Sequence, residues 1–61
     1  MLFKLVETIQ FPETDCEDVA ECVSIIVNSL HKCGIVKDGD RVHFENRDLI
    51  ITIYIYRPQG G

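Results

Sequence analysis

The residues of this chain best suited to chemistry are its cysteines and histidines, namely Cys16, Cys22, Cys33, His31 and His43. A cysteine becomes a nucleophile or a metal ligand when a histidine or another cysteine lies within reach of its sulfur. On a helix, His31 and Cys33 point to opposite sides, and we expect His43 on a sheet face that turns away from the helix. The sequence has no metal-ligand spacing and no phosphate-binding loop. We therefore expect no cofactor, no metal site and no enzymatic activity.

The cysteine spacing also predicts a redox state. If the segment from Thr14 to Cys33 is one helix, Cys16 and Cys22 form the closest pair and lie about 9 Å apart along its axis. This separation exceeds the ~7 Å over which a disulfide joins two Cα atoms. We therefore expect three reduced cysteines that pack as small apolar side chains, as in a cytoplasmic protein. No apolar run approaches the ~20 residues that span a bilayer, so we expect no membrane contact.

The net charge is −4, and the acidic residues are concentrated in the first half of the chain. Nucleic-acid-binding proteins usually carry a basic surface, so we expect no direct contact with nucleic acid. A row of carboxylates instead suits a partner protein with a basic surface, because it partly imitates a phosphate backbone. The expected partner-binding residues are Glu13, Asp15, Glu17, Asp18, Glu21 and Ile25. The alternative is an ordinary solvated helix face with one surface isoleucine.

The helix that carries these residues is expected to run from Thr14 to Cys33. Apolar residues recur at helical spacing within one broad stripe, which indicates an amphipathic helix with one face against a core. Thr14 is the expected N-cap, and Glu17 completes a capping box in which each side chain binds the other residue's backbone N–H. Gly34 suits the left-handed position that ends a helix.

Three segments alternate as β-strands, namely Leu2–Phe11, Arg41–Glu45 and Leu49–Tyr56. The odd-numbered residues of the first strand are apolar except Glu7, and we expect them to pack on the helix. An edge position that reaches solvent, or a nearby bulge, explains Glu7, and a functional carboxylate is the alternative. The other two strands are expected to form a hairpin, with Leu49, Ile51, Ile53 and Ile55 pointing inward. A two-residue turn at Asn46-Arg47 places Val42 opposite Ile51, and a longer turn is the alternative.

The element order β-α-β-β predicts a single α+β domain in which the helix packs on one face of a three-stranded sheet. The third strand is the most apolar and suits the centre, which gives the spatial order 1-3-2. The sequential order 1-2-3 is the alternative. Residues 1–57 are expected to form this domain. Residues 58–61 are expected to form a flexible C-terminal tail, because proline and glycine disfavour a strand.

The sheet face that turns away from the helix is the second candidate site. It is expected to carry Lys4, Val6, Arg41, His43, Ile50, Tyr54 and Tyr56. This face is too apolar for a plain solvated surface, and tyrosine suits interfaces because its ring is buried while its hydroxyl stays hydrogen-bonded. Because a chain of 61 residues has a small core, we expect this face to form a homodimer. Binding of a different protein, or of a small ligand stacked on the tyrosines, is the alternative.

The strand–helix–strand–strand order resembles that of dodecins, which are small oligomeric flavin-binding proteins. This chain has no tryptophan to stack on a flavin, so the resemblance does not extend to flavin binding. The Gly60-Gly61 end is similar to that of ubiquitin-like carrier proteins, but those begin with a hairpin, whereas one strand precedes the helix here.

The sequence therefore favours a small acidic interaction protein, a regulator or inhibitor that works as a cytoplasmic homodimer. A homo-oligomer that binds a small ligand is the competing interpretation.

Overall fold

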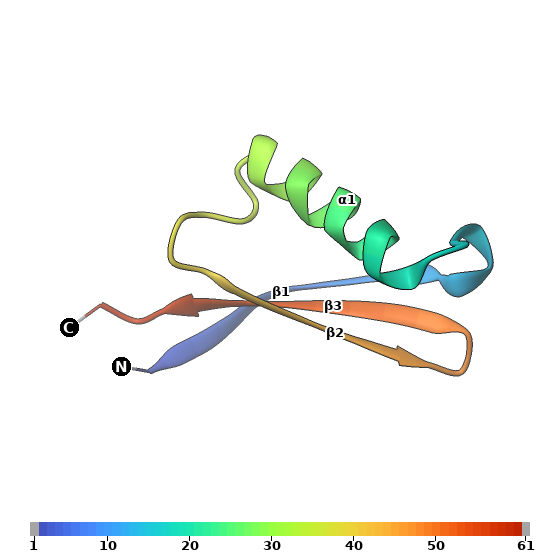
Figure 1. Ribbon diagram of the computed structural model, residues 1–61. Helices are drawn as coiled ribbons and strands as arrows, with labels where there is room; N and C mark the ends of the chain where they lie inside the picture. The colour runs from blue at the N-terminus through green and yellow to red at the C-terminus, as the bar shows by residue number, and fades with distance from the viewer. Residues whose placement is uncertain (1, 61) are drawn as a thin grey trace.

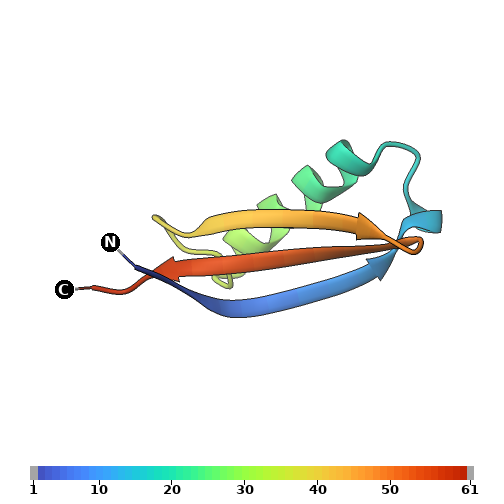
Figure 2. The same cartoon turned by 90° about the horizontal axis from the view of Figure 1, so that it is seen from below.

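The computed structural model describes residues 2–60 and has the architecture expected for a small α+β protein. Its elements are β1 (Phe3–Pro12), the 3-10 helix η1 (Glu13–Asp15), α1 (Val19–Lys32), β2 (Arg41–Arg47) and β3 (Ile50–Pro58). The strands form an antiparallel sheet in the order β1-β3-β2, and α1 lies over one face of it (Figures 1 and 2). The predicted β-α-β-β fold and the strand order 1-3-2 are confirmed.

The core lies between α1 and the central strand β3. Ile51, Ile53 and Ile55 have no exposed surface, and Val23 of α1 and Val36 pack with them. These isoleucines are the most deeply buried because β3 has a strand on each side and the helix above it. Complete burial of one such side chain contributes about 2 kcal/mol to stability.

The helix begins later than the sequence pattern predicts. Its first residue is Val19, and its N-cap is Asp18, whose Oδ1 accepts a hydrogen bond from the backbone N–H of Glu21 at 3.3 Å. The predicted capping box of Thr14 and Glu17 is therefore wrong, because both residues precede the helix.

Backbone hydrogen bonds explain this delay. The N–H of Glu13 donates to the carbonyl of Leu49 at 2.9 Å, which ties the end of β1 to the β2–β3 hairpin. The N–H of Cys16 then donates to the carbonyl of Glu13, also at 2.9 Å. Residues 13–16 are thus held in a turn beside the sheet, and the chain must travel further before α1 can start.

A β-bulge in β1 corrects the predicted inward face of this strand. The pairing with β3 shifts between Leu5 and Glu7, so Val6 is an extra residue and packs against the core. Before the bulge, Phe3 and Leu5 lie on the face that turns away from α1, where Leu5 is opposite Tyr56. Glu7 is exposed on an edge strand beside the bulge, as the structural explanation of this residue predicts.

The hairpin turn lies two residues beyond the predicted position. Asp48 and Leu49 form it, with positive φ angles of 53° and 63°. Val42 consequently pairs with Ile55 instead of Ile51. This shift is even, so the side chains that were predicted in the two strands and remain there keep their predicted faces. Leu49, predicted to point inward, is 66% exposed in the turn.

At the C-terminal end, β3 continues to Pro58, and the N–H of Gln59 donates to the carbonyl of Leu2 at 2.8 Å. Gly61, half of the predicted diglycine end, lies outside the described residues. No helix in the described part of the chain has the length and apolar character needed to cross a membrane.

Candidate functional site

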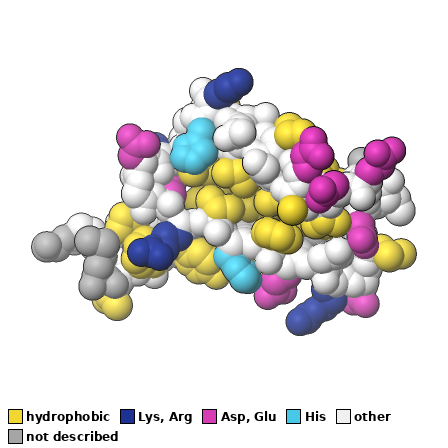
Figure 3. All heavy atoms as spheres, in the orientation of Figure 1, with side chains coloured by type: hydrophobic (Ala, Val, Ile, Leu, Met, Phe, Trp, Pro, Cys, Tyr) yellow, Lys and Arg dark blue, Asp and Glu magenta, His cyan; other side chains and the backbone are white. Residues whose placement is uncertain are grey.

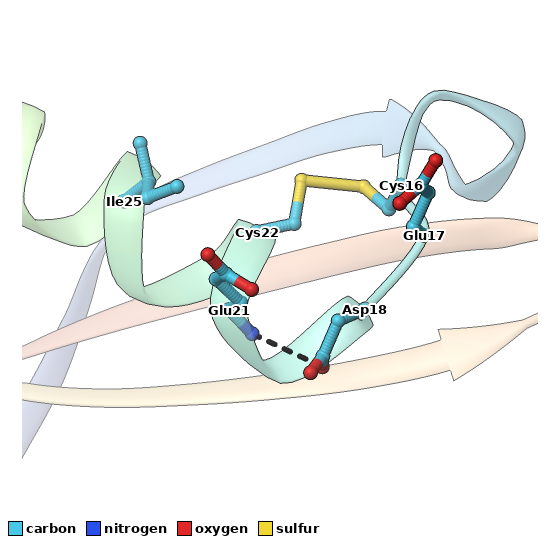
Figure 4. A pocket seen from close by; sticks show the side chains of 6 residues that line it. All are labelled: Cys16, Glu17, Asp18, Glu21, Cys22 and Ile25. Atoms are coloured by element: carbon cyan, nitrogen blue, oxygen red, sulfur yellow. Dashed lines mark hydrogen bonds between the residues drawn. A yellow bond between two sulfur atoms is a disulfide. The ribbon is translucent and has the colours of Figure 1, made fainter.

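Most of the predicted partner-binding residues meet at the start of α1. A shallow surface hollow there is lined by Cys16, Glu17, Asp18, Glu21, Cys22 and Ile25 (Figure 4). The three acidic residues are exposed, and 59% of Ile25 is accessible to solvent. Figure 3 shows acidic side chains gathered at this end of the molecule. We call Glu17, Asp18, Glu21 and Ile25 the acidic surface.

The helix fixes the arrangement of the acidic surface. Asp18 is held by its cap hydrogen bond to Glu21, so its carboxylate stays at the first turn of α1. Glu21 and Ile25 are four residues apart and therefore lie on one side of consecutive helical turns. Glu17 belongs to the segment that leads into the helix and reaches the same hollow. The result is an apolar side chain beside three carboxylates.

A disulfide between Cys16 and Cys22 forms part of the wall of this hollow (Figure 4). The prediction that no disulfide forms is therefore wrong. It assumed a helical rise between the two residues, but Cys16 precedes α1, and its segment folds back until the two Cα atoms are 6.0 Å apart. Cys33 is a free thiol and is exposed, whereas the sequence pattern predicted it in the core.

Two of the predicted partner-binding residues, Glu13 and Asp15, are not included in the acidic surface. Glu13 lies in η1 and lines a separate hollow with Thr14, Cys16 and Leu49. The side chain of Asp15 lies outside the described part of the structure. No sequence pattern indicates this division, because it depends on where the helix begins.

The outer face, defined as the sheet surface that turns away from α1, contains most of the residues predicted for it. Tyr54 and Tyr56 lie on its central strand and are half-buried. The ring of His43 stacks on Tyr54 with 6.1 Å between centroids. The guanidinium carbon of Arg41 lies 5.0 Å from the centroid of the Phe3 ring. This last contact joins β1 and β2 across the sheet.

The bulge changes which residues of β1 lie on the outer face. Lys4 pairs with Arg57 and Val6 packs against the core, so neither of these predicted residues lies on this face. Their places are taken by Phe3 and Leu5, which are 36% and 45% exposed. Ile50, at the other end of β3, is 44% exposed, as predicted for an outward residue.

An ion pair between Arg57 and Asp40 lies at the opposite end of the molecule from the acidic surface. Arg57 donates two hydrogen bonds to Asp40, and only 1% of the Asp40 side chain is exposed. These bonds, helped by the backbone N–H of Lys37, lower the pKa of Asp40 from its ordinary value of 3.8 to about 2. A carboxylate that stays ionised in this way is a structural anchor and a poor general acid.

The two histidines lie apart from the Cys16–Cys22 pair. His31 is near the end of α1, and His43 is on the outer face, so neither reaches the disulfide at the other end of the helix. Among the side chains that the structure describes, no group of three from His, Cys, Asp or Glu is placed to hold a metal ion.

Comparisons of the chain with protein-family models, with curated proteins and with solved structures found no match.

Proposed function

We propose that this protein is a non-enzymatic interaction module, a regulator or inhibitor that binds a basic partner protein through the acidic surface. The observation that supports this proposal is the exposed Ile25 beside the carboxylates of Glu17, Asp18 and Glu21 over one hollow. Interfaces commonly combine a desolvated apolar centre, which slows dissociation, with charges that speed association. The acidic surface offers both features within about two turns of α1.

The partner that fits best is a protein whose own ligand is polyanionic. Such proteins carry clustered Lys and Arg side chains that contact phosphates. Closely spaced carboxylates present a comparable row of negative charge, although they lack the regular spacing of a nucleic acid. An inhibitor of this kind would occupy the basic surface of a nucleic-acid-binding protein and prevent nucleic acid from binding there.

The expected cytoplasmic location is part of this proposal. This location bears on the disulfide that lines the hollow, because the cytosol keeps most thiols reduced. In that compartment Cys16 and Cys22 would be a dithiol, and the segment before α1 would be tied to the helix by packing alone. Rapid acid lysis, which protonates thiols and stops their exchange, followed by alkylation in neutral denaturant and mass spectrometry, tests this location. Three alkylated cysteines support it, and alkylation of Cys33 alone contradicts it.

The binding proposal is tested with a fluorescent peptide rich in Lys and Arg, whose association is followed by anisotropy in a stopped-flow instrument. The variant Asp18→Lys with Glu21→Lys should bind more slowly, and its association rate should depend less on salt. The variant Glu7→Lys with Asp38→Lys is the matched control, because it changes the net charge equally at exposed positions outside the hollow. Equal loss of association in both variants would show that net charge alone attracts the peptide.

The Ile25→Ala variant separates the apolar part of the proposal from the electrostatic part. Loss of this side chain should raise the dissociation rate and leave the association rate nearly unchanged. A parent-like dissociation rate would remove Ile25 from the proposed site.

The outer face supports a second candidate, a homo-oligomer that binds a small flat ligand. The observation in its favour is the stacked pair of His43 and Tyr54, because an aromatic surface of this kind can also stack on a ligand. Native mass spectrometry of freshly purified protein tests this candidate. A retained small molecule that is lost in Tyr54→Ala supports it, and a ligand-free mass spectrum in all preparations opposes it.

A further inference from the structure

The two edges of the sheet differ in their protection against pairing with another strand. β1 is interrupted by the bulge at Val6 and ends at Pro12, and both features obstruct a new strand. β2 runs from Arg41 to Arg47 with an uninterrupted register against β3, and it contains no proline. Every residue of β2 except Val42 is exposed. The open edge is therefore β2.

We propose that two copies of this chain pair through their β2 strands, antiparallel, to form a dimer with one continuous six-stranded sheet. A two-fold axis perpendicular to the sheet relates the two strands. Such an axis keeps both α1 helices on the same face of the extended sheet.

The backbone of β2 has the hydrogen-bonding groups that this pairing needs. Arg47 and Ile50 flank the two-residue turn and form a hydrogen-bonded pair, as such hairpins require. Hydrogen-bonded and non-hydrogen-bonded pairs alternate along an antiparallel ladder. The N–H and C=O groups of Val42, Phe44 and Asn46 therefore point away from β3 toward the open edge. A second β2 strand centred on Phe44 would supply about six hydrogen bonds to these groups.

Side chains on the helix side of β2 also favour a second copy. Phe44 faces this side, opposite Ile53, yet it is 39% exposed and is not among the residues packed on the core. Figure 3 shows hydrophobic side chains visible between α1 and the edge formed by β2. Pairing about Phe44 would bring the two Phe44 rings together and cover this apolar strip.

The charges on the outer side of β2 are complementary in the same register. His43 of one copy lies opposite Glu45 of the second copy. The Arg41 side chain, which contacts Phe3 within one copy, would turn from Phe3 to the open edge to reach the same Glu45 diagonally. A shift of the axis toward the turn would instead place the two Glu45 carboxylates opposite each other. In this register Arg41 lies directly opposite Arg47 of the second copy, but these like-charge pairs occur only at the two ends of the interface, where solvent screens their repulsion. Charge complementarity thus favours a second copy of this chain as the occupant of the edge.

The small core gives a physical reason for the dimer. Within residues 2–60, the hydrophobic residues that are buried are Val23, Val36, Ile51, Ile53 and Ile55. A chain of this size buries little of its surface alone, and oligomerisation commonly compensates.

Sedimentation velocity of the complete chain over a range of micromolar concentrations tests the proposal. We expect a dimer for the parent and a monomer for Phe44→Lys, because a charge that points toward the interface prevents edge pairing. Leu5→Lys, on the outer face, is the control and should remain dimeric. A monomeric parent, a dimeric Phe44→Lys variant or a monomeric Leu5→Lys variant would each overturn the proposal.

If Phe44→Lys fails to fold, variants that exchange the charges at positions 41 and 45 still test the proposed pairing. Glu45→Arg should raise the dimer dissociation constant about tenfold, because it replaces attraction with repulsion from Arg41 and His43 of the second copy. The double variant Arg41→Glu with Glu45→Arg should recover most of this loss. Failure of the double variant to recover affinity, with both proteins folded by circular dichroism, would contradict the proposed pairing.

Amide hydrogen exchange of the parent provides a readout that needs no variant. The amides of Val42, Phe44 and Asn46 should be protected at high protein concentration and lose protection on dilution. Protection that does not change with concentration would contradict the interface.

Discussion

Arg57 and Asp40 form a bidentate ion pair in which Nε lies 3.0 Å from Oδ1 and Nη2 lies 2.9 Å from Oδ2. The same Nη2 donates to the carbonyl of Ile35 at 3.1 Å, and Asp40 accepts from the N–H of Lys37 at 2.9 Å. The central strand is thereby fastened to the loop that connects α1 with β2. Two parallel hydrogen bonds fix both distance and orientation, which a lysine at position 57 would not do.

The Asp40→Asn variant should have a lower free energy of unfolding at neutral pH. This free energy should also depend less on pH under acidic conditions. Hydrogen bonds from Arg57 lower the pKa of Asp40 to about 2 in the folded protein, from 3.8 ordinarily. Between about pH 2 and pH 4 the unfolded chain therefore binds more protons than the folded protein. The free energy of unfolding consequently falls as the pH drops through this range. Urea unfolding at several pH values measures this slope, with Asp38→Asn as the control for a charge change in the same loop. A slope in Asp40→Asn as steep as in the parent would refute the role given to this pair.

Reduction of the Cys16–Cys22 disulfide should lower the free energy of unfolding by about 2 kcal/mol, the value expected for so short a closed loop. Cys16→Ser with Cys22→Ser should lose a similar amount and no longer respond to dithiothreitol. Cys33→Ser, at an exposed free thiol, should stay within about 0.5 kcal/mol of the parent. Thermal unfolding with and without reductant gives the comparison, and a parent that ignores the reductant would oppose this prediction.

Leu49→Gly should stabilise the protein by about 1 kcal/mol, because leucine is unfavourable at its φ of 63° and glycine is not. The resulting Asp-Gly pair also suits a two-residue hairpin turn. Gly39→Ala is the opposite change, since Gly39 has a φ of 91°, and it should destabilise by a similar amount. Changes of the same sign in both variants, measured by urea unfolding, would contradict this account of the turns.

Ile53→Val should cost about 1 kcal/mol, because this side chain is fully buried in the centre of the sheet. The same substitution at Ile25, which is 59% exposed, should change stability by less than about 0.5 kcal/mol. Chemical unfolding of the two variants compares one methyl group in two environments. Equal costs would mean that Ile25 is covered in solution.

The fold could be predicted because its main signals are local and periodic. Ile51, Ile53 and Ile55 alternate with outward residues, and this alternation alone identifies β3 as the buried central strand. The hairpin turn lies two residues beyond the predicted position, yet the inward residues other than Leu49 are correct because the shift is even. The bulge at Val6 leaves a weaker mark, the carboxylate of Glu7 on an otherwise apolar face, and this mark does not show which residues of the strand change face.

The candidate site was less predictable because it depends on contacts between distant segments. The hydrogen bond from Glu13 to Leu49 delays the helix, and this delay both breaks the predicted capping box and allows Cys16 to reach Cys22. No local pattern reports that bond. The Arg57–Asp40 pair was missed for the same reason, because 17 residues separate its members.

The most direct test of the proposed function is a titration of the nitrogen-15-labelled protein with a Lys- and Arg-rich peptide, followed residue by residue by NMR. We predict that the largest chemical-shift changes occur at Glu17, Asp18, Glu21 and Ile25 and diminish with added salt. Changes confined to the outer face around Tyr54, with the acidic surface unaffected, would contradict the proposal.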